Sequence, residues 1–250
     1  MLRYLILSCI VITASLCNAQ QTSGRAVYEK STAIKVNLGN SDPAMQRMLV
    51  DLPKSFDKRA ELLFSAAECL YQDIVAEPVD KPEGPPSSTR TISFVSGAPE
   101  RYHFDHETRR VQQVRSVLDR QFTVEDEAIF FDWQETGHTS FDAITGLPTR
   151  EATAVHSDGD TIVVQYTPSI ALPYGPEEYQ GLPGLIVQLQ KGKVSFQLQE
   201  LTLLDEAPAM PLPKAEGKTL TREKLDALRE RKEQALIDGM KSKGTVIQQN

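Results

Sequence analysis

Apolar and polar residues alternate along much of the chain. Between residues 100 and 106, Tyr102 and Phe104 alternate with charged or polar neighbours, which is typical of a strand with one buried face. Late in the chain, Val194, Phe196 and Leu198 alternate with polar residues in the same way. This pattern and the β-branched content predict strands over residues 24–36, 59–64, 68–75, 91–95, 100–106, 109–118, 121–126, 129–133, 150–156, 161–167, 185–190 and 193–203.

Short polar turns separate many of these segments. Residues 157–160 (Ser-Asp-Gly-Asp) and the pair Lys191-Gly192 each place a glycine between two apolar runs. Glycine readily takes the positive φ that a tight hairpin needs. So many consecutive strands predict a mainly β fold, with one large antiparallel sheet that is curved or partly closed into an open β-barrel.

Two segments have a helical pattern. Asp42 and Pro43 are a cap and first-turn pair that predicts a short N-terminal helix ending near Pro53. Residues 221–240 predict a C-terminal helix whose apolar stripe is thin, so this helix either docks lightly or lies exposed. Residues 77–89 carry four prolines and are expected to form a long loop inside one domain. The expected organisation is a β domain over residues 20–213, followed by a helix and tail over residues 214–250.

The first nineteen residues have the features of a signal peptide. Arg3 is followed by an apolar run over residues 4–16, which is too short to span a bilayer comfortably. Small residues ending at Ala19 suit cleavage before Gln20. The alternative, lipid attachment at Cys17, is disfavoured because the bulky Leu16 precedes it. The chain is therefore expected to be exported to the periplasm or cell envelope, with no integral membrane segment after cleavage.

Charge and cysteine content narrow the possible partners. The 250 residues carry 34 acidic and 27 basic side chains, a formal net charge of −7, which argues against nucleic acid or an anionic membrane as the main partner. Removal of residues 1–19 would leave Cys69 as the remaining cysteine. A single cysteine cannot form an internal disulfide, and we expect Cys69 to be a small buried apolar residue rather than a reactive thiol.

Residues able to carry chemistry are scattered. His103 and Asp105 share a strand face while His106 points the other way, so a common metal site is not expected. Residues 125–127 and Asp132 are acidic but lack calcium-loop spacing, and we interpret them as solvated turn acids. The sequence has no Gly-x-Ser-x-Gly, His-Glu-x-x-His or Cys-x-x-Cys motif. No metal, cofactor or catalytic residue is assigned on this basis.

The most unusual segment covers residues 173–186. Pro183 and Gly184 are expected to form a type II turn, with Gly184 in the conformation that other residues resist. Leu182, Leu185 and Ile186 should anchor this turn to the core. The segment has two interpretations: a structural corner, or the rim of a binding mouth. The residues of the second interpretation are Tyr174, Tyr179, Gly181, Leu182, Pro183 and Gly184.

The hexapeptide Gly-Leu-Pro-Gly-Leu-Ile at residues 181–186 resembles the signature of the GLPGLI family of exported bacterial proteins. The resemblance extends over roughly residues 24–205 and implies an all-β envelope protein without an assigned reaction or catalytic residues. Residues 146–149 depart from the family pattern, because they lack the cysteine that many members have there. The other matching segments are residues 64–71, Asp132-Trp133, Gly146, Ala152, residues 166–168 and Gly175-Pro176.

These observations predict a non-enzymatic envelope protein that binds a lipophilic or peptide ligand, or an envelope partner, on the concave side of its sheet. An alternative is a periplasmic hydrolase or peptidase-like enzyme that uses acids near Asp105 or Asp126. A third interpretation assigns the helix over residues 221–240 as the contact for a protein partner.

Overall fold

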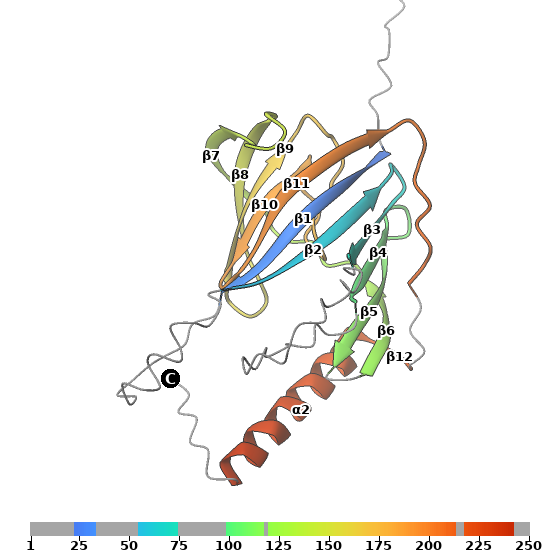
Figure 1. The fold of residues 1–250 in the computed structure, drawn as a ribbon, viewed down its shortest axis with the longest axis vertical. Coiled ribbons are helices and arrows are strands. Elements are labelled where there is room, and N and C mark those ends of the chain that lie inside the picture. Colours follow the sequence, from blue (N-terminus) through green and yellow to red (C-terminus); the bar gives the residue numbers. More distant parts are fainter. Residues whose placement is uncertain (1–22, 34–54, 75–98, 118–119, 214–217, 243–250) are drawn as a thin grey trace, which may run out of the picture.

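The computed structural model describes residues 23–33, 55–74, 99–117, 120–213 and 218–242 (Figure 1). Within these residues the chain forms one open 12-stranded sheet and one helix. The strands are β1 (Ser23–Ala33), β2 (Ser55–Phe64), β3 (Glu68–Asp73), β4 (Arg101–Asp105), β5 (Arg110–Val117), β6 (Arg120–Glu127), β7 (Gln134–Phe141), β8 (Pro148–Val155), β9 (Thr161–Thr167), β10 (Leu185–Lys191), β11 (Val194–Leu204) and β12 (Thr219–Leu220), and the helix is α2 (Arg222–Ser242).

The predicted large sheet is confirmed, and it is not closed. Its order is β12-β6-β5-β4-β3-β2-β1-β11-β10-β9-β8-β7, so β12 and β7 are its two edges. Neighbouring strands are antiparallel except for β12, which pairs with β6 in parallel at Thr123 and Val124. Figure 1 shows β1, β2, β10 and β11 crossing the middle of the molecule, with β7 and β8 on one side and β5, β6 and α2 on the other.

One predicted strand is wrong, and two observed strands, β7 and the short β12, were not predicted. Residues 129–133 are not a strand, although they are strongly apolar. Phe131 and Trp133 pack on the core instead, whereas Phe130 is 50% exposed, and the Trp133 indole donates a hydrogen bond to the carbonyl oxygen of Gln180 at 2.9 Å. The next segment, Gln134–Phe141, is the edge strand β7. All eight of its residues are exposed, so it lacks the alternation that identified the other strands.

Several predicted segments lie outside the described residues. They are the leader over residues 1–19 with Cys17, the helix from Asp42 to Pro53, the loop at 77–89 and the strand at 91–95. The hairpin turns at residues 157–160 and Lys191-Gly192 are confirmed, with φ of 90° at Gly159 and 53° at Gly192. Within the described residues, no helix is long and apolar enough to cross a membrane.

A continuous core covers one face of the sheet, here called the inner face. Tyr28 on β1, Phe64 on β2, Phe104 on β4 and Phe196 on β11 belong to it and are at most 1% exposed. The Tyr28 hydroxyl donates a hydrogen bond to the carbonyl oxygen of Ile186 at 2.6 Å. This bond connects the inner face to the start of β10, where the unusual segment ends.

Cys69 is buried and free, as the sequence predicts. Burial raises the pKa of its thiol, and the charge of Glu68 adds to this effect. Since the thiolate is the nucleophile, we expect native protein to resist alkylation at Cys69 by iodoacetamide, and unfolded protein to react readily. Mass spectrometry of the Cys69 peptide, with and without urea, measures this difference. Equal labelling in the two states would show that the thiol is accessible.

Helix α2 docks through its first turns. Leu225 is 3% exposed and packs with Val117 of β5 and Val124 of β6 in a small separate cluster. At the helix start, the Asp126 carboxylate accepts a hydrogen bond from the backbone N–H of Arg222 at 3.2 Å, as a capping residue does. The thin stripe therefore docks the beginning of the helix on β6.

Leu225→Ala should loosen this docking without unfolding the sheet. Removing a buried leucine from such a small cluster is expected to cost roughly 2 kcal/mol, at the low end for this change. Hydrogen exchange should show faster exchange of α2 amides and unchanged exchange in β1 and β11. Lys224→Ala, an exposed site on the same helix, is the control. Equal acceleration in α2 and in the central strands would contradict a separate docking cluster.

Candidate functional site

The segment between β9 and β10 crosses the inner face of the sheet. Its backbone is tied to the start of β10, because Leu185 donates to the carbonyl of Ile170 at 3.1 Å and Ile186 donates to that of Tyr174 at 2.9 Å. Tyr174 packs edge-on against Phe104, with ring centroids 6.2 Å apart. These contacts hold the segment as part of the core.

The predicted type II turn at Pro183-Gly184 is wrong. The glycine with positive φ is Gly181, at 101°, and Gly184 does not have this conformation. Gly184 is required for a different reason: a Cβ there would lie 2.3 Å from the carbonyl oxygen of Thr167, on the neighbouring strand. The predicted anchoring by Leu182, Leu185 and Ile186 is confirmed, since all three are buried.

The six residues predicted as a binding rim do not share one surface. Tyr174 is fully buried, and its hydroxyl donates to the carbonyl of Ala66 at 3.4 Å. Leu182 and Gly184 are also buried, whereas Gly181 and Pro183 are exposed. Tyr179, 6% exposed, is the member of this set that lines a cleft.

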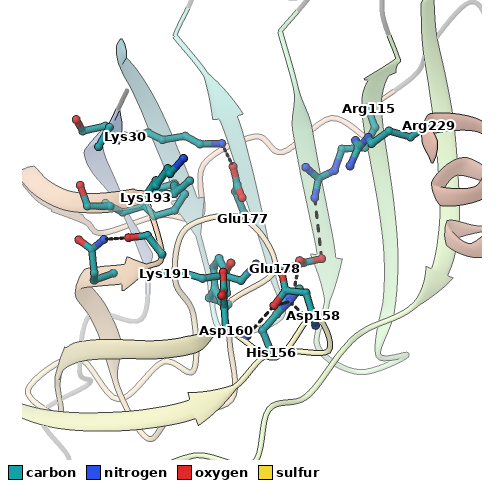
Figure 2. Close-up of a pocket in the computed structure, with 18 residues that line it drawn as sticks. Lys30, Arg115, His156, Asp158, Asp160, Glu177, Glu178, Lys191, Lys193 and Arg229 are labelled. Atoms are coloured by element: carbon teal, nitrogen blue, oxygen red, sulfur yellow. Dashed lines mark hydrogen bonds and ion pairs between the residues drawn. The ribbon is translucent and has the colours of Figure 1, made fainter. Parts of the chain in front are cut away.

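That cleft has a volume of about 940 Å³ and is here called the charged cleft. It lies between the β8–β9 and β10–β11 hairpins, the end of β1, the 173–180 segment, β5 and α2. Figure 2 shows Lys30 and Lys193 on one side, Arg115 and Arg229 on the other, and Glu177 between them. Its acidic, basic and histidine lining residues are Lys30, Arg115, His156, Asp158, Asp160, Glu177, Glu178, Lys191, Lys193 and Arg229.

Glu177 occupies a strained turn in this cleft. Its φ is 53°, and the turn is closed by the Tyr179 N–H donating to the carbonyl of Pro176 at 3.3 Å. For a residue other than glycine this conformation costs about 1–2 kcal/mol. The turn also needs Gly175, where a Cβ would lie 2.5 Å from the carbonyl oxygen of Tyr179. Such strain is concentrated at functional sites in proteins, which makes Glu177 a candidate site residue.

The Glu177 carboxylate forms an ion pair with Lys30 of β1. Burial opposes both charges, yet the pKa of Glu177 is lowered, because Lys30 and Arg115 stabilise its ionised form. The pKa of Lys30 is raised against the effect of burial by the charge of Glu177 and the hydrogen bond to it. The pair is therefore ionised at neutral pH.

Arg115 of β5 is another charged residue that lines the cleft. Its guanidinium lies 3.2 Å from Glu100 and 4.0 Å from Glu178, and its Nε donates to the side-chain oxygen of Gln113 at 2.8 Å. Burial would lower the pKa of Arg115, but the charges of Glu177, Glu100 and Glu178 raise it. Arg115 is thus fixed between acidic side chains.

His156 connects two acidic residues at the other end of the cleft. Its Nδ1 lies 2.9 Å from Asp158 Oδ1 and its Nε2 lies 3.8 Å from Glu178 Oε1. The ring stacks on Phe131, with centroids 6.1 Å apart and an angle of 27° between the planes. Lys191 Nζ contacts Asp158 at 2.5 Å, and this bond lowers the pKa of the Asp158 carboxyl. These contacts fix His156 and Asp158 in the lining of the cleft.

The remaining sequence candidates have local structural contacts. His103 is buried, with Nε2 at 2.7 Å from Glu68, and Asp105 accepts a hydrogen bond from the Thr108 N–H at 2.8 Å. Asp126 caps α2. In the described part of the chain, no group of three His, Cys, Asp or Glu residues could hold a metal ion.

Sequence reasoning missed Glu177, Glu178 and the basic residues that surround them. The available signal was local: two adjacent acids between Pro176 and Tyr179, inside an otherwise apolar segment. The cationic partners come from distant strands, since Lys30 is 147 residues from Glu177. No periodicity in the sequence indicates that such residues meet.

Comparison with known proteins identifies no activity. A family model described as "Protein of unknown function (Porph_ging)" matches residues 103–188, which include the 181–186 hexapeptide. No curated protein matches the chain. Two solved structures resemble the fold: "Structure of PNGF-II in C2 space group", with a TM-score of 0.52 and 12% identity, and "Structure of PNGF-II in P21 space group", with 0.51 and 13%.

The structural likeness concerns the fold alone. The matches cover 83% of this chain but 32% and 33% of the two PNGF-II chains. This chain therefore corresponds to about a third of the length of those proteins.

Proposed function

We propose that this protein is an exported, non-enzymatic binding module of the cell envelope whose charged cleft takes a polar peptide segment. The observation that carries the proposal is the network of ion pairs along the cleft wall, from Lys30–Glu177 through Arg115 to His156–Asp158. Side chains that are held before binding lose little conformational freedom when a ligand arrives. The volume of about 940 Å³ is within the range of small-molecule and peptide sites.

The lining favours a peptide over a lipophilic ligand. An apolar molecule in this cleft would remove charged groups from water without offering them a partner, which costs free energy. A peptide offers carbonyl oxygens, N–H groups and charged side chains to the same groups. The location in the envelope is supported by the signal-peptide features of residues 1–19 and by the resemblance of residues 181–186 to the GLPGLI signature.

Selection of peptides followed by mapping tests this proposal. Short random peptides displayed on phage are selected on the immobilised full chain, and a selected peptide is titrated into isotope-labelled protein while NMR shifts are recorded. We expect the largest shifts at Lys30, at residues 156–160, at residues 177–179 and at residues 191–196. Selection of no peptide, or shifts outside these residues, would contradict the proposal. Shifts confined to α2 would favour the interpretation of that helix as the partner contact.

The hydrolase alternative is tested in the same samples. Asp105 and Asp126, the acids considered for it, bind backbone N–H groups outside the charged cleft. We expect mass spectrometry to recover the selected peptide intact after prolonged incubation with the protein. Cleavage that persists in repurified protein would replace the binding proposal with an enzymatic one.

A further inference from the structure

Arg229 of α2 is one of the basic residues that line the charged cleft. It lies four residues after Leu225, so the two side chains share one face of the helix, and docking of Leu225 on β6 turns Arg229 toward the charged cleft. Arg229 is half-buried, and Figure 2 shows it reaching toward Arg115. Unlike Arg115, it forms no ion pair with any residue that the structure describes.

A second unpaired cation lines the cleft at the β10–β11 turn. Lys193 is exposed, and within the described chain it has no acidic partner, whereas its neighbour Lys191 is bound to Asp158. Three acids of the lining, Glu177, Glu178 and Asp158, already have basic partners. The lining therefore has two unpaired basic side chains and, among its described acids, one without an ion pair, Asp160.

We propose that the charged cleft binds an acidic peptide segment, with ligand carboxylates pairing with Arg229 and Lys193. This inference rests on the proposed function and specifies its ligand. A guanidinium group binds a carboxylate through two parallel hydrogen bonds, which gives both strength and orientation. The paired acids cannot supply this carboxylate, because Lys30 and Arg115 hold Glu177 and Glu178 in place.

A carboxylate and a phosphate must be distinguished by experiment. A group with nearly two negative charges is attracted more strongly by Arg229 and Lys193 and also repelled more strongly by Glu177 and Glu178, which line the same cleft. The net charge of −7 does not prevent binding of an acidic peptide. At physiological salt, exposed charges more than about 8 Å away are largely screened, so the contacts in the cleft decide the affinity.

Matched peptides test this inference on the full chain. One labelled peptide alternates glutamate and serine, a second replaces each glutamate with glutamine, and a third carries phosphoserine. Fluorescence anisotropy should show the glutamate peptide binding at least about tenfold more tightly than the glutamine peptide, as expected for charge-assisted hydrogen bonds. Preference for the phosphoserine peptide would overturn the assignment of a carboxylate ligand.

Two variants locate the contact. Arg229→Gln and Lys193→Gln should each weaken binding of the glutamate peptide several-fold and leave binding of the glutamine peptide unchanged. Lys224→Gln, an exposed site on α2 away from the cleft, should change neither. Equal binding of the two peptides, or an equal loss in Lys224→Gln, would overturn this inference. If neutral selected peptides still bind in the cleft, the proposed function stands; if no peptide binds, both proposals fail.

Discussion

Replacing Gly184 with alanine is expected to destabilise the protein by roughly 3 kcal/mol or more, the upper range for forcing extra volume into a packed site. The new Cβ would lie 2.3 Å from the carbonyl oxygen and 2.7 Å from the carbonyl carbon of Thr167. Both are backbone atoms at the end of β9, and Tyr166 on the same strand is completely buried. Relief would require β9 and β10 to separate where the 168–184 segment joins the sheet.

Gly181→Ala is the matched control in the same hexapeptide. There the backbone has φ of 101°, but the nearest atom to a new Cβ, Phe130 Cδ1, is 3.5 Å away. The cost should be backbone strain alone, about 1–3 kcal/mol. Urea unfolding of the two variants, compared by midpoint and slope, measures the difference. A larger loss for Gly181→Ala would mean that turn conformation, rather than close packing at Gly184, is the stronger requirement for glycine in this segment.

The glycines illustrate what the sequence could and could not predict. That residues 181–186 form a tight element anchored by apolar neighbours follows from local composition. Which glycine needs positive φ, and which needs space, depends on the approach of Thr167 and Phe130. These residues are close only in the folded sheet, so the turn type could not be derived from the hexapeptide.

The strands also show which features local sequence could predict and which it could not. Period-two alternation predicted strands at Tyr102 and Phe196 because each has one face in the core. Strand β7 has no such face, as all its residues are exposed; its backbone pairs with β8, and its Glu135 accepts a hydrogen bond from the Tyr166 hydroxyl of β9. Conversely, the apolar segment at residues 129–133 does not join the sheet. Its Phe131 ring stacks on Tyr179, and its Trp133 indole donates to the carbonyl oxygen of Gln180.

The residues that line the charged cleft could not be predicted from the sequence. It gathers β1, β5, three turns and α2, which are separated by most of the chain. Its central residue, Glu177, adopts a conformation that is uncommon outside glycine, and its partner Lys30 is one of many lysines in a polar context. The concave binding face stays a prediction, and four of the six residues named for it, Tyr174, Tyr179, Leu182 and Gly184, are buried.

Lys30→Met is expected to destabilise the protein by about 3 kcal/mol at neutral pH, because it leaves the Glu177 carboxylate with an incomplete set of partners. The side chains of Lys30 and Glu177 are only 23% and 17% exposed. The cost is at the low end for a broken buried pair, because the charge of Arg115 still stabilises Glu177. The double variant Lys30→Met/Glu177→Gln removes the uncompensated charge and should recover most of the loss. Urea midpoints of the three proteins test this order.

The effect should also depend on pH. The pKa of Glu177 is lowered from 4.5 in the folded protein, so its pairing stabilises the fold above that value and is lost as the pH falls through the folded pKa. The gap between the parent and Lys30→Met should therefore shrink in acid. Arg59→Met, which breaks an ion pair of 2.7 Å with both side chains 55% exposed, is the control and should cost no more than about 1 kcal/mol. A similar loss in both variants, or a gap that does not shrink in acid, would show that the Lys30–Glu177 pair stabilises the fold no more than a surface contact.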